Sequence, residues 1–170
     1  MKRVVSILCA FLLVISMCGC SEQKSEYVEK EISATQLQKK MNDKKSFVFI
    51  VERENCEYCE ALEKYIKQTK DEHPGLVLYK LDSTDFEFSK ISEDSKQLKS
   101  NTEDGNILLN IAPYFLYTPS IYVIQNGKAT HSAIGYDSST NEVSLWDMDS
   151  TVDFDTADTQ NFWEFLETYE

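Results

Sequence analysis

The segment Ser46-Phe-Val-Phe-Ile-Val-Glu-Arg-Glu-Asn-Cys56-Glu-Tyr-Cys59 joins a predicted buried strand to two cysteines at the start of a predicted helix. The apolar run at 46–51 favours the strand, and the periodicity of residues 61–68 favours the helix. Cysteines at this spacing lie on one helix face, where their sulfurs can join, and the helix N-terminus stabilises a thiolate. A disulfide across so short a loop constrains the unfolded chain little, so the pair indicates reversible dithiol chemistry rather than a structural crosslink.

The N-terminus is typical of a bacterial export signal. Lys2 and Arg3 precede an apolar stretch that ends near Met17 and is too short for a comfortable membrane span. Gly19 before Cys20 resembles the lipobox of bacterial lipoproteins, in which the cysteine is diacylated and becomes the mature N-terminus. The sequence therefore predicts a signal peptide at residues 1–19, a lipidated N-terminus with a polar tether at 20–31, and one domain at 32–170.

This signal accounts for three of the five cysteines. Cys9 is removed with the signal, and so is Cys18 unless it replaces Cys20 as the lipidated residue, for which its bulky neighbour makes it the weaker candidate. The alternative to a cleaved lipoprotein signal is an uncleaved signal anchor. Only Cys56 and Cys59 remain as thiols after cleavage. A disulfide framework is thereby excluded, and a lone pair outside the cytoplasm indicates redox exchange with other proteins.

The chain is strongly acidic. Its formal net charge is −12 over 170 residues, and the signal contains bases but no acids, so the mature chain is more acidic still. This argues against nucleic acid as a partner and against electrostatic attraction to anionic lipid. We interpret the acidity as solubility outside the cell, and the length allows one domain with a single core.

The hydrophobic pattern predicts an α/β sandwich around a mixed sheet. Ser33-Ala-Thr-Gln36 is a capping box that opens a helix, and Asn126-Gly127 between two β-type runs is a strong hairpin signal. Strands at 46–51 and 76–81, joined through a helix, form a βαβ unit with parallel strands. The other predicted elements are helices at 89–99 and 105–112, strands at 121–124 and 128–134, and a final helix at 159–166.

This order of elements resembles the thioredoxin fold, with Thr118-Pro119 placed immediately before a strand. The resemblance implies that Cys56 is the exposed nucleophile and Cys59 the buried resolving cysteine. It also implies that Pro119 is a cis-proline and that Thr118 before it pairs with substrate. Lys80 falls in the central strand, where thioredoxins carry a lysine near the buried thiol.

The implied fold is a thioredoxin-like three-layer α/β/α sandwich with a mixed central sheet, covering residues 33–169. It carries an added helical insertion at 82–117, before the cis-proline, and an acidic insertion at 137–158, before the C-terminal helix. The lipoprotein signal, the bare C-x-x-C and the long connection are most similar to bacteriocin transport accessory proteins. Those are extracytoplasmic thioredoxin-like lipoproteins of Gram-positive bacteria.

The sequence departs from the thioredoxin pattern at two places. Thioredoxins read W-C-G-P-C, whereas the inner pair here is Glu57-Tyr58. The family's buried aspartate, which assists deprotonation of the resolving thiol, is replaced by Ile50. Glu52 on the same strand face, together with Lys80, is a candidate for this proton transfer; the alternative is that Glu52 points at solvent.

Acidic residues around the cysteines oppose the effect of the helix on the thiolate. Besides Glu52, these are Glu54, Glu57 and Glu60, and Arg53 offsets part of their charge. The acids argue against an extreme oxidant and the missing aspartate argues against a fast reductant. This balance favours an intermediate thiol–disulfide oxidoreductase or an isomerase.

No metal and no cofactor are expected. The only histidines, His73 and His131, do not complete a four-ligand zinc site with the cysteines. The aspartates at 147–155 lack the glycine and terminal glutamate of a calcium loop, which favours a solvated acidic loop.

Two groups of aromatic residues have alternative interpretations. One group is expected in the core or at its rim, and consists of Trp146, Phe162 and Trp163. The other either lines an apolar groove for an unfolded client or packs under the added helix, with packing favoured, and consists of Tyr114, Phe115 and Tyr117.

These observations predict a thiol–disulfide oxidoreductase anchored to the outer face of a Gram-positive cell membrane through acylated Cys20. Its partners would be cysteine-containing secreted or cell-surface proteins, which it would oxidise, isomerise or reduce, and a membrane redox partner. One alternative is a reductant for cytochrome c maturation. The other is a non-catalytic thioredoxin-fold lipoprotein that acts as a binding or immunity module.

Overall fold

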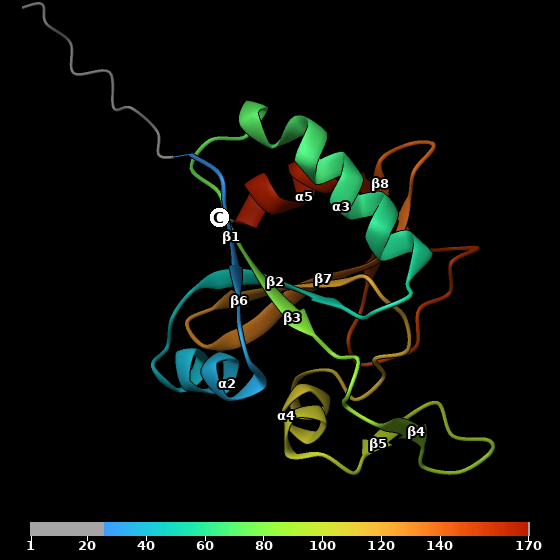
Figure 1. The fold of residues 1–170 in the computed structure, drawn as a ribbon. Helices are drawn as coiled ribbons and strands as arrows, with labels where there is room; N and C mark the ends of the chain where they lie inside the picture. The colour runs from blue at the N-terminus through green and yellow to red at the C-terminus, as the bar shows by residue number, and fades with distance from the viewer. Residues whose placement is uncertain (1–25, 170) are drawn as a thin grey trace, which may run out of the picture.

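A seven-stranded mixed sheet lies at the centre of the computed structural model, which describes residues 26–169 (Figure 1). The strand order is β1-β3-β2-β6-β7-β8-β9. β1, β3 and β2 are parallel, and β6 to β9 continue the sheet antiparallel. The strands are β1 (Val28–Glu31), β2 (Phe47–Glu52), β3 (Val77–Asp82), β6 (Ser120–Gln125), β7 (Lys128–Asp137), β8 (Glu142–Trp146) and β9 (Thr159–Asn161).

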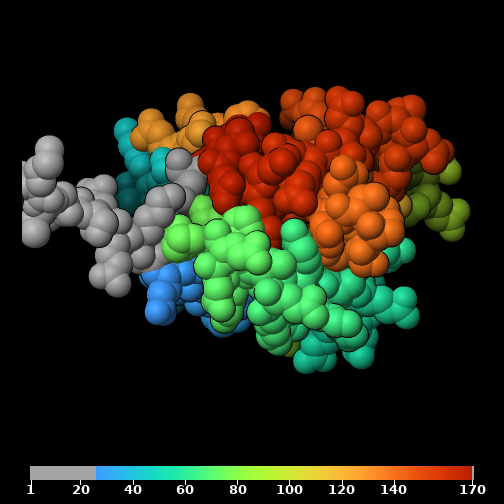
Figure 2. Space-filling view, turned by 90° about the horizontal axis from the view of Figure 1, so that it is seen from above, coloured from blue at the N-terminus to red at the C-terminus, as the bar shows by residue number. Residues whose placement is uncertain are grey.

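Helices cover both faces of the sheet. Figure 1 shows α3 and α5 on one face and α2 and α4 on the other, and Figure 2 shows α3 and α5 side by side as the outer layer of their face. The α-helices in the described residues are α2 (Ala34–Asn42), α3 (Glu57–Thr69), α4 (Glu103–Ile111) and α5 (Phe162–Tyr169), with a short 3₁₀ helix η2 (Lys70–Glu72) after α3.

The two helix layers produce two hydrophobic clusters, one on each side of the sheet. Because successive strand residues point to opposite faces, Phe49 of β2 packs toward α2 and α4 while Ile50 packs toward α3 and α5. Both side chains are fully buried. The same alternation continues from Val51 to Glu52, so Glu52 is placed on the face that carries α3.

This architecture confirms the predicted thioredoxin-like α/β/α sandwich with a mixed sheet. The βαβ unit is parallel, and the hairpin turns at Asn126 and Gly127, both with positive φ. The capping box of α2 forms as expected, with Ser33 and Gln36 each accepting a hydrogen bond from the other's backbone N–H. Trp146, Phe162 and Trp163 are buried, as predicted for core aromatics.

The helix expected at 89–99 is wrong. This region forms a separate two-stranded antiparallel sheet of β4 (Phe88–Lys90) and β5 (Leu98–Ser100), and only the second expected helix is present, as α4. The Phe88 ring packs edge-on against Phe115, with centroids 5.3 Å apart, and this contact favours an extended strand over a solvated helix.

Both insertion and tether boundaries also need correction. The segment 137–158 is not wholly an insertion, because β8 within it extends the sheet and buries Trp146 beside Tyr122. The tether assigned to 20–31 includes β1, which pairs with β3. All four residues of β1 are exposed, so its backbone hydrogen bonds leave no apolar pattern in the sequence. The predicted signal and Cys20 lie outside the described residues.

No helix within residues 26–169 is long and apolar enough to cross a membrane.

Gly127 joins the β6–β7 hairpin to the end of α2. Its N–H donates to the carbonyl of Lys45 at 3.0 Å, its φ is +75°, and a Cβ here would collide with the backbone carbonyl of Met41. Gly75 also has a positive φ, +100°, but an added Cβ there would meet no atom within 4 Å. Alanine at position 75 would therefore add backbone strain alone, whereas alanine at position 127 would add both strain and a steric collision.

We expect Gly127→Ala to lower the free energy of unfolding by about 2–4 kcal/mol, because it adds a collision to the strain. Gly75→Ala, which adds strain alone, should lower it by about 1–2 kcal/mol. Urea unfolding followed by circular dichroism measures both values. Equal losses in the two variants would contradict the close approach of the hairpin to α2.

Candidate active site

The cysteine pair lies where β2 passes into α3. Asn55 has φ +54°, which turns the chain sharply, and Cys56 is the N-cap of α3. The N–H of Cys59 donates to the Sγ of Cys56 at 3.2 Å, in the place of an ordinary capping oxygen. The two cysteines form a disulfide, with Cα atoms 5.2 Å apart. The sulfur that caps the helix therefore belongs to the predicted nucleophile.

Thr118 and the cis bond to Pro119 lie directly against this sulfur. The pairing of Val51 with Ser120 brings the start of β6 beside the end of β2. The Thr118 hydroxyl donates to the Sγ of Cys56 at 3.2 Å, and the Thr118 carbonyl oxygen lies 3.4 Å from the same sulfur.

Arg53 extends this contact to a positive charge. Its Nε–H donates to the Oγ1 of Thr118 at 3.3 Å, so the guanidinium polarises the hydroxyl that donates to Cys56. This chain of donors and the helix N-terminus both favour negative charge on the Cys56 sulfur. The sequence analysis noted the charge of Arg53 but not its path through Thr118, which depends on a contact 65 residues away in the sequence.

The expected contrast in exposure between the two cysteines is absent. Cys56 is 5% exposed and Cys59 is 6% exposed, because Thr118 covers the first sulfur. What distinguishes them is access to a cleft of ≈ 820 Å³, since Cys56 lines this cleft and Cys59 does not. The cleft runs between the cysteine loop and the β4–β5 sheet, and Phe88, Tyr117 and Thr118 also line it.

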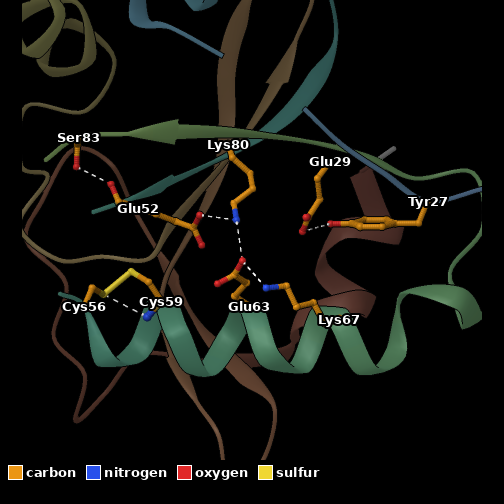
Figure 3. A network of polar contacts seen from close by, with 9 residues as sticks. All are labelled: Tyr27, Glu29, Glu52, Cys56, Cys59, Glu63, Lys67, Lys80 and Ser83. Carbon is orange, nitrogen blue, oxygen red and sulfur yellow. Dashed lines mark hydrogen bonds and ion pairs between the residues drawn. A yellow bond between two sulfur atoms is a disulfide. The ribbon is translucent and has the colours of Figure 1, made fainter. Parts of the chain in front are cut away.

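Glu52 and Lys80 form an ion pair beneath the disulfide. Their charged atoms are 3.0 Å apart, and the side chains are only 16% and 14% exposed. Lys80 also lies 4.0 Å from Glu63, which follows Cys59 by one turn on the same face of α3. Figure 3 shows the Glu52 carboxylate between Lys80 and the first turns of α3. Glu52 therefore points into the protein, not at solvent.

Burial determines the protonation behaviour of this pair. It raises the pKa of Glu52 above the ordinary value, and the ammonium of Lys80 offsets only part of that rise. Burial alone would lower the pKa of Lys80, but the Glu52 carboxylate, with smaller contributions from Glu29 and Glu63, raises it. Ser83 fixes the strand end, because its N–H and hydroxyl both donate to the Glu52 carbonyl at 2.9 Å.

The structure brings together all the predicted site residues within the described range: Cys56, Cys59, Thr118, Pro119, Glu52 and Lys80. Glu63, which joins the ion-pair network, was missed. Its spacing of four from Cys59 was the available signal, because residues at that spacing share a helix face. Within residues 26–169, no group of three or more histidine, cysteine, aspartate or glutamate side chains is arranged to hold a metal ion.

Comparison with known proteins finds similarity only at the level of structure. No protein-family model and no curated protein sequence matches the chain. Among solved structures, a thioredoxin from Malassezia sympodialis is 19% identical, with a TM-score of 0.44 and coverage of 66% of this chain and 85% of its own. A single-residue mutant of a thioredoxin from Halobacterium salinarum is 13% identical, with a TM-score of 0.43 and coverage of 85% and 90%.

A third similar structure is thioredoxin O2 of Arabidopsis thaliana in its oxidised state. It is 15% identical, with a TM-score of 0.41 and coverage of 68% of this chain and 88% of its own. The strand order and the helices on both faces define the thioredoxin-like fold in the chain itself.

The Glu52–Lys80 pair predicts a pH-dependent defect in Lys80→Met. Without the ammonium, burial is left to raise the pKa of Glu52 further, so the carboxylate is accommodated at low pH as the neutral acid and destabilises the fold once ionised. The variant's stability deficit should therefore widen as pH rises, to about 2–3 kcal/mol near about pH 8.

Urea unfolding of wild type and variant at about pH 5 and about pH 8 measures this deficit. The control is the double variant Glu52→Gln/Lys80→Met compared with Glu52→Gln alone. The deficit that Lys80→Met adds in this background should not widen with pH, because the buried carboxylate is gone. A Lys80→Met deficit that is constant between the two pH values would contradict the buried pairing.

Proposed function

We propose that this protein is a membrane-anchored extracytoplasmic thiol–disulfide oxidoreductase that acts on cysteines of secreted proteins. The observation that carries the proposal is the sulfur of Cys56, which caps α3, accepts a hydrogen bond from Thr118 and lines an open cleft. A purely structural disulfide would need neither the donors nor the cleft. The Gly19-Cys20 pair, which resembles a lipobox at the end of the predicted signal, supports anchoring at the outer membrane face.

The reaction follows from the two thiols. The Cys56 thiolate attacks one sulfur of a client disulfide, and the other client sulfur leaves as a thiolate and takes up a proton. The thiolate of Cys59 then attacks the Cys56 sulfur and releases the second client thiol. Two electrons pass from the cysteine pair to the client, and in the reverse direction the oxidised pair accepts two electrons from a client dithiol.

Thr118 and Arg53 act on the first of these steps. The hydroxyl of Thr118 donates to the sulfur that carries the charge, and the guanidinium of Arg53 orients and polarises that hydroxyl. Stabilising the thiolate makes the disulfide easier to reduce, so this pair of contacts favours a more oxidising site.

Glu52 acts on the second step. Cys59 must lose its proton before it attacks, and the Glu52 carboxylate lies on the side of α3 that carries Cys59 and Glu63. Because burial raises the pKa of Glu52, its carboxylate is a stronger base than an ordinary glutamate and accepts a proton more readily. Lys80 holds this carboxylate in place.

The first test uses Cys59→Ser and the reduction potential of the pair. In cells that express Cys59→Ser, clients should accumulate as mixed disulfides with Cys56, and Cys56→Ser/Cys59→Ser should capture none. Equilibration of the detergent-solubilised full chain with glutathione should give a potential between about −120 and −270 mV. A potential below about −300 mV together with no trapped client would refute the catalytic proposal and favour a binding module with a permanent disulfide.

The second test concerns Glu52. Glu52→Gln keeps the shape of the side chain but cannot take up a proton, so resolution of the mixed disulfide should slow by about tenfold to a hundredfold. Its formation at Cys56 should change far less. Since the pKa of Glu52 is raised, the wild-type resolution rate should increase with pH above the range of an ordinary glutamate. In the variant only the increase that follows ionisation of the attacking thiol itself should remain.

Stopped-flow single-turnover kinetics across a pH series separates the two steps. The matched control is Glu60→Gln, which removes the same charge from an exposed position on α3. Equal slowing of formation and resolution in Glu52→Gln would overturn the role of Glu52 as the base for Cys59.

A further inference from the structure

A second cavity of ≈ 550 Å³ adjoins the cleft at Cys56. The two share Tyr58, Tyr117 and Thr118 as lining residues. In Figure 2 the turn between β7 and β8 lies beside the first turn of α3, which is where this cavity opens. Its walls combine aromatic rings with carboxylates: Tyr58, Tyr117, Tyr136, Phe154, Asp137 and Glu142.

The aromatic wall is held in place by backbone geometry. Gly135 has φ +71°, and a Cβ at this position would lie 3.3 Å from the Phe154 ring, so glycine allows the ring to lie against β7. Phe154 also packs edge-on against Tyr117, with centroids 5.3 Å apart. Even so, Tyr58, Tyr117 and Phe154 remain 62%, 49% and 48% exposed. Three large aromatic residues thus remain uncovered around one opening beside the redox-active sulfur.

The charge of this cavity is negative. Asp137 and Glu142 line it, and none of its lining residues within the described chain is a lysine, arginine or histidine. The hydroxyl and N–H of Ser139 donate to Asp137 and hold the pKa of that carboxyl below its ordinary value. The cleft at Cys56, in contrast, is lined by Arg53 and Lys90 as well as by acids. The two adjoining spaces therefore differ in the charge that they favour.

We propose that this aromatic and acidic cavity binds a lysine or arginine side chain of the client, close in sequence to the client cysteine that reacts with Cys56. The inference rests on the proposed function, whose site the cavity adjoins, and adds a substrate preference to it. Carboxylates attract the cation, and the faces of Tyr58, Tyr117 and Phe154 provide cation–π contacts and cover the aliphatic stem. A purely apolar side chain would gain only the second contribution.

The position of Thr118 limits where the basic residue lies. Thr118 lines both spaces, and its Oγ1 is 3.2 Å from the Cys56 sulfur. An extended chain advances about 3.3–3.6 Å per residue, so a cation in the cavity belongs to a residue within about three positions of the client cysteine. The favoured client segment is therefore an exposed, extended stretch in which a cysteine and a lysine or arginine are near neighbours.

The test compares symmetrical peptide disulfides that differ only at the residue two positions from cysteine: lysine, norleucine or glutamate. Reduced full-length protein in neutral detergent cleaves each disulfide to two peptide thiols as its own pair becomes oxidised. We expect the second-order rate constant of this single turnover to be about fivefold larger for the lysine peptide than for the norleucine peptide, with the glutamate peptide slowest. Raising the salt concentration should shrink the advantage of lysine over norleucine.

Two variants and two matched controls locate the preference. Glu142→Gln should reduce the advantage of lysine to about twofold, because it removes the charge but can still accept from Thr159, and Phe154→Ala should reduce it similarly. Glu93→Gln and Ile91→Ala remove an exposed charge and an exposed apolar side chain from the loop between β4 and β5. Both controls should retain the full fivefold preference.

Two further measurements distinguish failure of this inference from failure of the proposed function. Hydroxyethyl disulfide, which is small and neutral, reports the redox reaction without the cavity. Fluorescence anisotropy of peptides with serine in place of cysteine reports binding without the redox reaction, and should rank lysine above norleucine in the wild type. If hydroxyethyl disulfide is reduced but all three peptides react and bind alike, the cavity preference is overturned and the oxidoreductase stands.

Discussion

The register between β2 and β6 determines where the whole site lies. Antiparallel pairing of Val51 with Ser120 places the end of one strand beside the start of the other. Residues that follow β2, from Arg53 to Cys56, therefore meet the residues that precede β6, Thr118 and Pro119. A shift of one residue in this pairing would turn every side chain of a strand to the opposite face of the sheet. The hydrophobic pattern of both strands therefore stabilises the observed register.

The same strand places a carboxylate on the α3 side of the sheet, although Ile50 stands where thioredoxins carry an aspartate. Ile50 and Glu52 share the face toward α3, so moving the acid two residues along β2 keeps it on the correct side. The new position is at the strand end, where Ser83 fixes the backbone and Lys80 pairs with the carboxylate. A buried ion pair of this kind is weak evidence for stability, and its protonation change is the more informative property.

The sequence predicted the features that depend on local pattern. The cysteine spacing, the capping box at Ser33 and the Asn126-Gly127 hairpin each carry a signal within a few residues, and the structure contains them. Features that depend on distant contacts were missed. Edge strand β1 is wholly exposed, and the β4–β5 sheet depends on packing of Phe88 against Phe115. Whether Glu52 faced solvent could not be decided before Lys80 was placed beside it.

Tyr117 illustrates why the aromatic residues before Pro119 were ambiguous. Phe115 is buried, as the packing interpretation favoured, but Tyr117 is half exposed and lines both spaces beside Cys56. The two residues are two positions apart and would share a face in a strand, but the chain bends between them and β6, so one is buried and the other is exposed. The packing interpretation is therefore confirmed for Phe115, whereas Tyr117 lines the two spaces beside Cys56 and a role for it in client binding stays a prediction.

The acids around the cysteines also act differently from a simple sum of charges. Glu52 is compensated by Lys80, and Glu57 and Glu60 are exposed, where water and salt screen their effect on the sulfur. The donors to Cys56 are in direct contact: the Cys59 N–H, and the Thr118 hydroxyl that Arg53 polarises. Contacts at hydrogen-bond distance outweigh screened charges farther away, so the local geometry favours the thiolate despite the acidity of the chain. Asp137 and Glu142 line the adjoining cavity, which has no basic lining residue within the described chain. In the proposed role they attract a basic side chain of the client and do not contact the sulfur.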